Sequence, residues 1–257
     1  MTRNLALVCL ALALCPALRA EEAAAQGDDW RAADAAIDRH LVSPTAQTLA
    51  AGEFSFSDYE IVGLGLSYGI TDRLEASFTT AVPWPLPVFG GVASVKARAW
   101  GNRWCTVSGQ VVLEYAYSLR HTHVLTPALA ALVDLHTPDG SLLWSTAVGV
   151  LQPFAFGGGW AGRNTDRPLW ALASGPVVRV HPHVRLLAQV VALGGFGTVH
   201  TASEPHGDGL TAEAVLAWGV RFSGRDVALD LGAVSYLGRT EHPLQAIFPI
   251  ASLTVRF

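Results

Sequence analysis

The stretch Ile247-Phe-Pro-Ile-Ala-Ser-Leu-Thr-Val-Arg-Phe257 decides how the rest of the chain is interpreted. Every second residue is apolar, and the positions between them include Ser252, Thr254 and Arg256. A period of two is the pattern of a β-strand, whose successive side chains point to opposite faces of a sheet. We therefore predict a strand with one apolar and one polar face that runs to an aromatic residue, Phe257.

The same alternation recurs from residue 47 onward and predicts about twelve strands of roughly ten residues, the length that a tilted membrane-spanning strand requires. The predicted strands are 49–57, 60–71, 74–82, 93–99, 105–115, 125–135, 142–152, 168–181, 184–196, 210–222, 227–237 and 247–257. Short turns alternate with longer loops, and the turns lie at Asp72, Asn102, Asp139, Pro182 and Gly224. This arrangement is typical of outer-membrane barrels. The predicted fold class is all-β, an antiparallel up-and-down transmembrane β-barrel over residues 47–257.

The composition agrees with a barrel in a membrane. Hydrophobic residues make up 51% of the chain and charged residues only 15%, whereas soluble domains carry about 25% charged residues. After the first residues no apolar run is long enough for a membrane helix. A soluble lipocalin-like barrel would have fewer strands and an apolar interior, but here glycine, serine and charge share the face opposite the apolar one. The net charge of −4 argues against a nucleic-acid partner.

The first residues have the pattern of a secretory signal peptide. Thr2-Arg3-Asn4 is a small basic region, and the apolar run Leu5–Leu14 follows it. We predict a signal peptide over residues 1–20 with cleavage after Ala20, and cleavage at Ala23-x-Ala25 is the alternative. Removal of this segment would leave Cys105 as the only cysteine, so no internal disulfide is expected.

An acidic segment, residues 21–46, separates the signal peptide from the barrel; we call it the leader. Its apolar residues Trp30, Ala33, Ile37 and Leu41 are spaced about one helical turn apart, which favours a short helix. Two interpretations remain open at this point. The leader is either a disordered periplasmic segment or an acidic helix folded into the mouth of the barrel.

The turn sequence Tyr68-Gly-Ile-Thr-Asp-Arg-Leu-Glu75 resembles turns that recur in Gram-negative outer-membrane β-barrel proteins of the porin-like and transporter-like superfamily. Together with the signal peptide and the final strand, the resemblance covers nearly the whole mature chain. It implies a place in outer-membrane lipid and insertion by the barrel-assembly machinery, with Leu253, Val255 and Phe257 as the assembly signal. Both mature termini are then expected on the periplasmic side. The resemblance brings no catalytic or substrate-binding residues.

The strand register predicts which charges face the lumen. The inward basic residues near the short turns are Arg73, Lys96, Arg98, Arg179, Arg185, Arg221 and Arg256. The predicted inward acidic residues are Glu75, Glu114, Asp134, Glu213 and Asp230. Three interpretations follow: an interior salt-bridge network, a constriction that prefers anions, or a lumen closed by the acidic leader.

The favoured function is a narrow passive pore for small solutes, anionic ones if the constriction prefers anions. The alternatives are a plugged, non-conducting barrel with a structural or binding role and a membrane-embedded lipid-active enzyme. The sequence indicates no catalytic residue, because Asp134 and His136 share one wall but lack a nucleophile beside them. The spacing of the loop histidines His121, His123, His200, His206 and His242 is not specific for a metal. We therefore expect no enzyme, cofactor or metal, and the oligomeric state stays open.

Overall fold

The computed structural model describes residues 30–31, 34–59, 63–81, 88–118, 122–156, 168–195, 212–237 and 247–257. The predicted signal peptide, the first part of the leader, most of the long loops and four of the loop histidines lie outside the described residues. The excluded histidines are His121, His200, His206 and His242.

Thirteen strands form one antiparallel sheet that closes on itself. Their bounds are β1 Phe54–Tyr59, β2 Gly63–Thr71, β3 Leu74–Ala81, β4 Val88–Gly101, β5 Cys105–Ser118, β6 Thr122–His136, β7 Leu142–Leu151, β8 Phe154–Phe156, β9 Leu169–His181, β10 Val184–Gly195, β11 Ala212–Ser223, β12 Val227–Tyr236 and β13 Ile247–Arg256. Closure comes from the antiparallel pairing of β1 with β13, with Ser57 opposite Thr254. The prediction of a barrel of about twelve strands is confirmed, because twelve of the strands make the ring and β8 is an addition.

Two elements differ from the sequence-based expectation. The first strand begins at Phe54 and not at Leu49, because residues 47–53 bond to the inside and rim of the barrel. We call residues 47–53 the crossing segment. The short strand β8 falls in a predicted loop and pairs with β6, His123 opposite Phe156. Alternation alone does not reveal a three-residue strand.

The two faces of the ring differ in polarity. Each strand exposes at least one large apolar side chain on the outside, for example Leu66 of β2, Val111 of β5 and Trp218 of β11. The buried polar residues lie on the opposite face. A closed ring leaves no unpaired strand edge, and an apolar outer face suits a surrounding of lipid. No helix in the described residues is long and apolar enough to cross a membrane.

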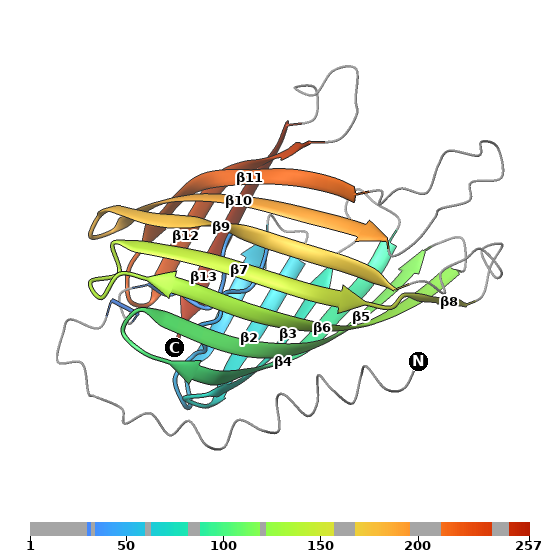
Figure 1. The fold of residues 1–257 in the computed structure, drawn as a ribbon, viewed down its shortest axis with the longest axis horizontal. Helices are drawn as coiled ribbons and strands as arrows, with labels where there is room; N and C mark the ends of the chain where they lie inside the picture. The colour runs from blue at the N-terminus through green and yellow to red at the C-terminus, as the bar shows by residue number, and fades with distance from the viewer. Residues whose placement is uncertain are drawn as a thin grey trace.

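The barrel has two unlike ends (Figure 1). Tight turns join β2 to β3, β4 to β5, β6 to β7, β9 to β10 and β11 to β12 at one end, which we call the turn end. The strand ends that the other connections join lie at the opposite end, which we call the loop end. β1 starts and β13 finishes at the turn end, so the leader reaches the barrel there.

Candidate functional site

The described leader residues lie inside the turn end of the barrel, and most of them are buried. They form turns rather than the predicted helix. The N–H of Ile37 donates to the carbonyl of Asp34, and the N–H of Thr45 donates to the carbonyl of Asp38, which closes a loop over residues 38–45. A helix would use these backbone groups internally, but here many of them bond to side chains of the barrel wall.

Arg221 of β11 is the main anchor of the leader. Its Nε and Nη2 atoms donate to the two carboxylate oxygens of Asp230 at 2.7 and 2.9 Å. Its Nη1 donates to the carbonyl oxygens of Ala36 and Arg39 at 2.8 and 3.2 Å and to Asp34 Oδ2 at 3.3 Å. One fully buried guanidinium therefore binds a wall carboxylate in a bidentate manner and holds the leader through three further contacts.

Two more basic side chains of the wall bind the leader. Arg185 of β10 lies 3.4 Å from Asp34 Oδ2 through its Nε and also donates to the hydroxyl of Ser223. Lys96 of β4 pairs with Glu75 of β3 at 3.2 Å and donates to the carbonyl of Asp38 at 3.2 Å. These cations are engaged by carboxylates and by leader backbone, so they do not form an open charged ring.

The wall also supplies acceptors and donors for the leader backbone. Asp134 of β6 accepts from the N–H of Ala46 and from Gln47 Nε2, both at 3.0 Å. Glu75 accepts from the N–H of Leu49 at 3.0 Å, and the hydroxyl of Ser108 donates to the carbonyl of Ala46. Asp134 is fully buried. The acidic groups thus recognise the end of the leader and the crossing segment, whereas the basic groups recognise its earlier part.

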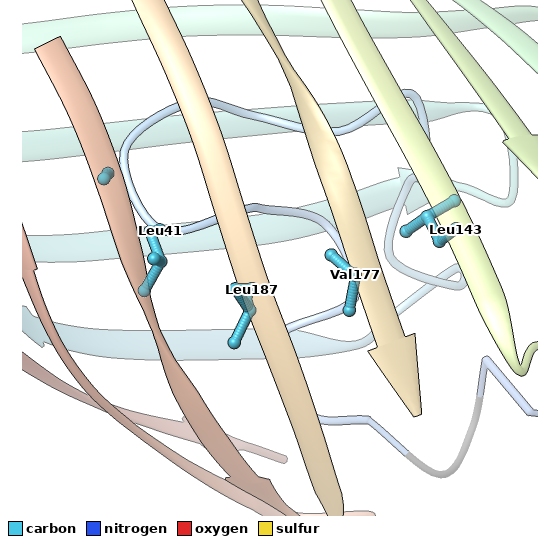
Figure 2. Close-up of a cluster of buried hydrophobic side chains, with 5 residues drawn as sticks. Leu41, Leu143, Val177 and Leu187 are labelled. Atoms are coloured by element: carbon cyan, nitrogen blue, oxygen red, sulfur yellow. The ribbon is translucent and has the colours of Figure 1, made fainter. Parts of the chain in front are cut away.

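A cluster of apolar side chains, which we call the apolar wall, lines one side of the lumen. Its members are Leu143 of β7, Val177 of β9, Leu187 of β10 and Ala217 of β11. Leu41 of the leader packs against this group, and Figure 2 shows it beside Leu187. Burying one leucine side chain contributes about 1.5–3 kcal/mol. The leader therefore docks through apolar contacts as well as through charge.

His40 is locked between the leader and β9. Its Nδ1 accepts from the N–H of Leu41 at 2.9 Å, so the proton is on Nε2, which donates to the carbonyl of Pro176 at 3.2 Å. Burial and, secondarily, the positive charge of Arg221 lower the pKa of His40 from its ordinary 6.5 to about 4. The docked leader therefore holds a neutral histidine.

A cavity of about 540 Å³ remains between the leader loop 38–44 and the inner faces of β1–β5; we call it the vestibule. Its lining is rich in serine, threonine and glycine, in contrast to the apolar wall. The pair Lys96 and Glu75 lies at its turn-end floor, and Glu114 lies nearer the loop end. The leader thus closes the turn end and leaves a polar chamber above it.

The predicted site residues occupy several different environments. Buried in the turn end are Lys96, Arg185, Arg221, Arg256, Glu75, Asp134 and Asp230. Half-buried are Arg98 and Arg179, and exposed are Arg73, Glu114 and Glu213. Arg256 lies 3.9 Å from Glu53, and Arg179 lies 3.8 Å from Asp139. In the final strand Leu253 and Phe257 are exposed on the outer face, with Val255 between them half-buried.

Sequence reasoning missed several docking residues. The contacts that hold the leader also involve His40 and Leu41 of the leader, Gln189 and Leu187 of β10, and the carbonyl of Pro176. One signal was available for the apolar wall. Val177 lies two positions from the predicted inward residue Arg179, and Leu187 lies two positions from Arg185. Strand alternation therefore places both apolar side chains in the lumen, where they need an apolar partner.

The contacts of His136 are packing and hydrogen-bonding contacts inside the barrel. Its Nε2 lies 3.3 Å from the hydroxyl of Thr106, and its ring packs 5.3 Å from that of Trp30. The side chain is buried. Among the described residues no group of three His, Cys, Asp or Glu side chains is placed to hold a metal ion.

Comparison with known proteins shows that this chain is similar to solved structures in fold only. No family model and no curated protein sequence matches the chain. Among solved structures, the NanC porin is 9% identical over 80% of this chain and 99% of that chain, with a TM-score of 0.47. LpxR from Salmonella typhimurium is 9% identical with the same coverages and a TM-score of 0.43. The translocator domain of autotransporter NalP from Neisseria meningitidis is 9% identical over 80% of this chain and 86% of its own, with a TM-score of 0.40.

The fold itself defines the class. The closed antiparallel ring, its apolar outer face and its polar lumen make this chain an outer-membrane β-barrel. The expectation that the chain is not an enzyme is wrong as an inference from this architecture. Enzymes occur among outer-membrane barrels, so the fold gives no reason to exclude catalysis.

Proposed function

We propose that the chain is a pore kept closed by its own leader, which conducts small solutes only when the leader leaves the turn end of the lumen. The observation that supports this proposal is the set of contacts between Arg221 and the leader. Arg221 binds Asp230 through two of its nitrogen atoms and donates through the third, Nη1, to three oxygen atoms of the leader. These contacts make Arg221 a specific docking point for the leader. The narrow pore expected from the sequence is thus retained, and the docked leader accounts for its closed state.

The test is single-channel conductance of the mature protein in planar bilayers. The variant carries Asp34→Asn and Leu41→Ala, which remove a charge partner of Arg221 and the contact with the apolar wall. It also carries Ser43→Cys and Gln189→Cys, whose native side chains are in contact, in a Cys105→Ser background. We expect this chain to be silent when oxidised and to conduct when reduced.

The oxidised and reduced forms of one polypeptide control for each other, since they differ in a single bond. A second variant lacking residues 21–46 should conduct in both conditions. Silence of this deletion variant, with a correctly folded barrel, would show that the lumen is not a pore. Equal conductance of the oxidised and reduced forms would show that the leader does not close it.

The proposal includes an orientation, with the turn end in the periplasm. Short turns face the periplasm in barrels of this class, and the leader would then close the pore from the inside. An epitope tag within residues 157–167 should be labelled on intact cells, whereas a tag between Asp139 and Gly140 should be labelled only after permeabilisation. The reverse pattern would invert the orientation and leave the plug proposal intact.

A further inference from the structure

A row of four serines crosses the inner face of β1–β4 above the floor of the vestibule. Ser55 lies opposite Ser67, Ser67 opposite Ser77, and Ser77 opposite Ser94 in the strand register. The hydroxyls of Ser77 and Ser94 are 2.7 Å apart, and Gln110 Nε2 donates to Ser94 Oγ at 2.8 Å. The row presents hydroxyl and amide groups side by side in a line, and Ser67, Ser77, Ser94 and Gln110 line the cavity.

The next row toward the loop end adds space and one charge. Its register positions are Ser57, Gly65, Thr79, Val92 and Glu114. Gly65 has no side chain, so the wall is recessed at the second of the five positions. Glu114 lines the vestibule, is exposed to it, and has no hydrogen-bond or ion-pair partner in the part of the chain that the structure describes.

The charges at the floor leave the vestibule acidic. The ammonium of Lys96 is matched by Glu75 at 3.2 Å. Asp38 of the leader also lines the cavity and is buried, and its Oδ1 has no hydrogen-bond partner among the described residues. Arg39 lines the cavity too, so two basic side chains, Lys96 and Arg39, stand against the three carboxylates of Glu75, Asp38 and Glu114. A buried carboxylate oxygen without a donor favours a ligand that supplies one.

We infer that the vestibule binds a small polyhydroxylated cation of the amino-sugar class. The serine row and Thr79 would bond the hydroxyl groups, and Glu114 and Asp38 would receive the ammonium. A volume of about 540 Å³ lies within the usual range of small-molecule sites. The same carboxylates would repel an anion, which reverses the anion preference expected from the sequence. The inference rests on the proposed function, because the docked leader forms the floor of the site.

The experiment is isothermal titration calorimetry on the mature protein in detergent with three probes of one size: glucosamine, glucose and glucuronate. We expect glucosamine to bind best, glucose more weakly, and glucuronate not measurably. Glu114→Gln should reduce glucosamine affinity roughly tenfold and leave glucose unchanged, since a hydrogen bond to a charged group is lost. Ser77→Ala with Ser94→Ala should weaken both sugars.

The matched control is Glu213→Gln. Glu213 is an exposed glutamate on β11 that does not line the vestibule, so its substitution should leave all three affinities unchanged. Equal binding of glucosamine and glucuronate, or an equal effect of the two glutamate substitutions, would overturn the inference. Limited proteolysis of the titrated wild-type protein within residues 34–46 reports leader docking separately. Protein whose leader resists the protease but that binds no glucosamine refutes the site alone, and protein whose leader is cleaved as fast as an unfolded chain refutes the plug.

Discussion

At the scale of single residues, the leader depends most on Arg221. Its guanidinium serves Asp230 of the wall and Asp34 of the leader together, and all three side chains are buried. Removing Arg221 would take the bidentate partner from Asp230 and leave Asp34 with Arg185 alone. The stability of the barrel and the position of the leader are therefore coupled through one side chain.

Arg221→Ala should lower the free energy of unfolding by about 3–5 kcal/mol, since it removes the bidentate partner of buried Asp230 and leaves buried Asp34 with Arg185 alone. Denaturant titration of the refolded protein in lipid vesicles measures this change. Arg179→Ala is the control, because Arg179 pairs with an exposed partner, Asp139. An exposed pair contributes about 1 kcal/mol or less. Similar losses in both variants would contradict the anchoring role of Arg221.

His40 makes leader docking sensitive to pH. The docked pKa of about 4 lies below the ordinary 6.5, so the neutral form is favoured when docked. Docking is fully stable above about pH 6.5, weakens as pH falls toward 4, and loses up to about 1.4 kcal/mol per pH unit in that window. A dye on Val42→Cys, in a Cys105→Ser background, should become more mobile at pH 5 than at pH 7 by fluorescence anisotropy.

The control for this pH effect is His40→Asn, which keeps a hydrogen-bond acceptor near the Leu41 N–H but does not titrate. The change in anisotropy between pH 7 and pH 5 should disappear in this variant. If the asparagine variant responds to pH as the wild type does, another group controls the release of the leader.

At the scale of elements, the crossing segment ties the leader to the barrel rim. The N–H of Gly52 donates to the carbonyl of Gly69 at 2.8 Å, and the N–H of Gly69 donates to the carbonyl of Glu53 at 2.9 Å. A Cβ atom at Gly69 would lie 1.9 Å from the carbonyl oxygen of Ala50. The crossing segment therefore passes over β2 at a position where only glycine leaves room.

Gly69→Ala should displace the crossing segment and break the bond from the Ala51 N–H to Asp72. Limited proteolysis measures the result, and we expect cleavage near residue 50 to be at least tenfold faster than in the wild type. Gly195→Ala is the matched control, because an added Cβ there meets only Leu169, at 3.7 Å. Equal resistance of the two variants to the protease would show that the rim tolerates the extra atom.

The strands could be predicted from the sequence, but for the leader the sequence left two interpretations open and could not give its contacts, for a physical reason. Alternation is a local property, and in this ring each face has a single polarity over most of a strand, so β2 and β12 were located within a few residues. The leader is held by residues far away in the chain: Asp34 meets Arg221, 187 positions on, and Ser43 meets Gln189, 146 positions on. The inward charges at Lys96 and Arg185 were found by parity, but their leader partners are backbone atoms or distant side chains.

At the scale of the whole molecule, ring closure joins the first strand to the last, β1 to β13. Phe257 donates its N–H to the carbonyl of Phe54 at 2.8 Å and accepts from the N–H of Phe54 at 3.1 Å. Its side chain is 74% exposed on the outside, so little of its contribution can come from packing within the chain. The residue completes the ladder at the turn end, next to the start of the crossing segment.

Deletion of Phe257 should lower the amount of assembled barrel several-fold, because it removes the last closing backbone pair and the terminal aromatic of the predicted assembly signal. The measurement is the heat-modifiable band on gels of isolated outer membranes. Phe248→Ala, which removes an exposed aromatic side chain from the same strand, should assemble normally. Equal assembly of both variants would contradict the role of Phe257.

The crossing segment also makes the leader a tethered ligand of its own barrel. A short connection keeps a detached leader near its docking site, at an effective concentration of about a millimolar. A leader that leaves Arg221 is therefore recaptured quickly. Open intervals should be brief, and a synthetic leader peptide supplied from outside will compete with the attached one only at comparable concentrations. Under the function and orientation proposed above, sustained opening requires that a periplasmic component hold the released leader, and that component would set the duration of each opening.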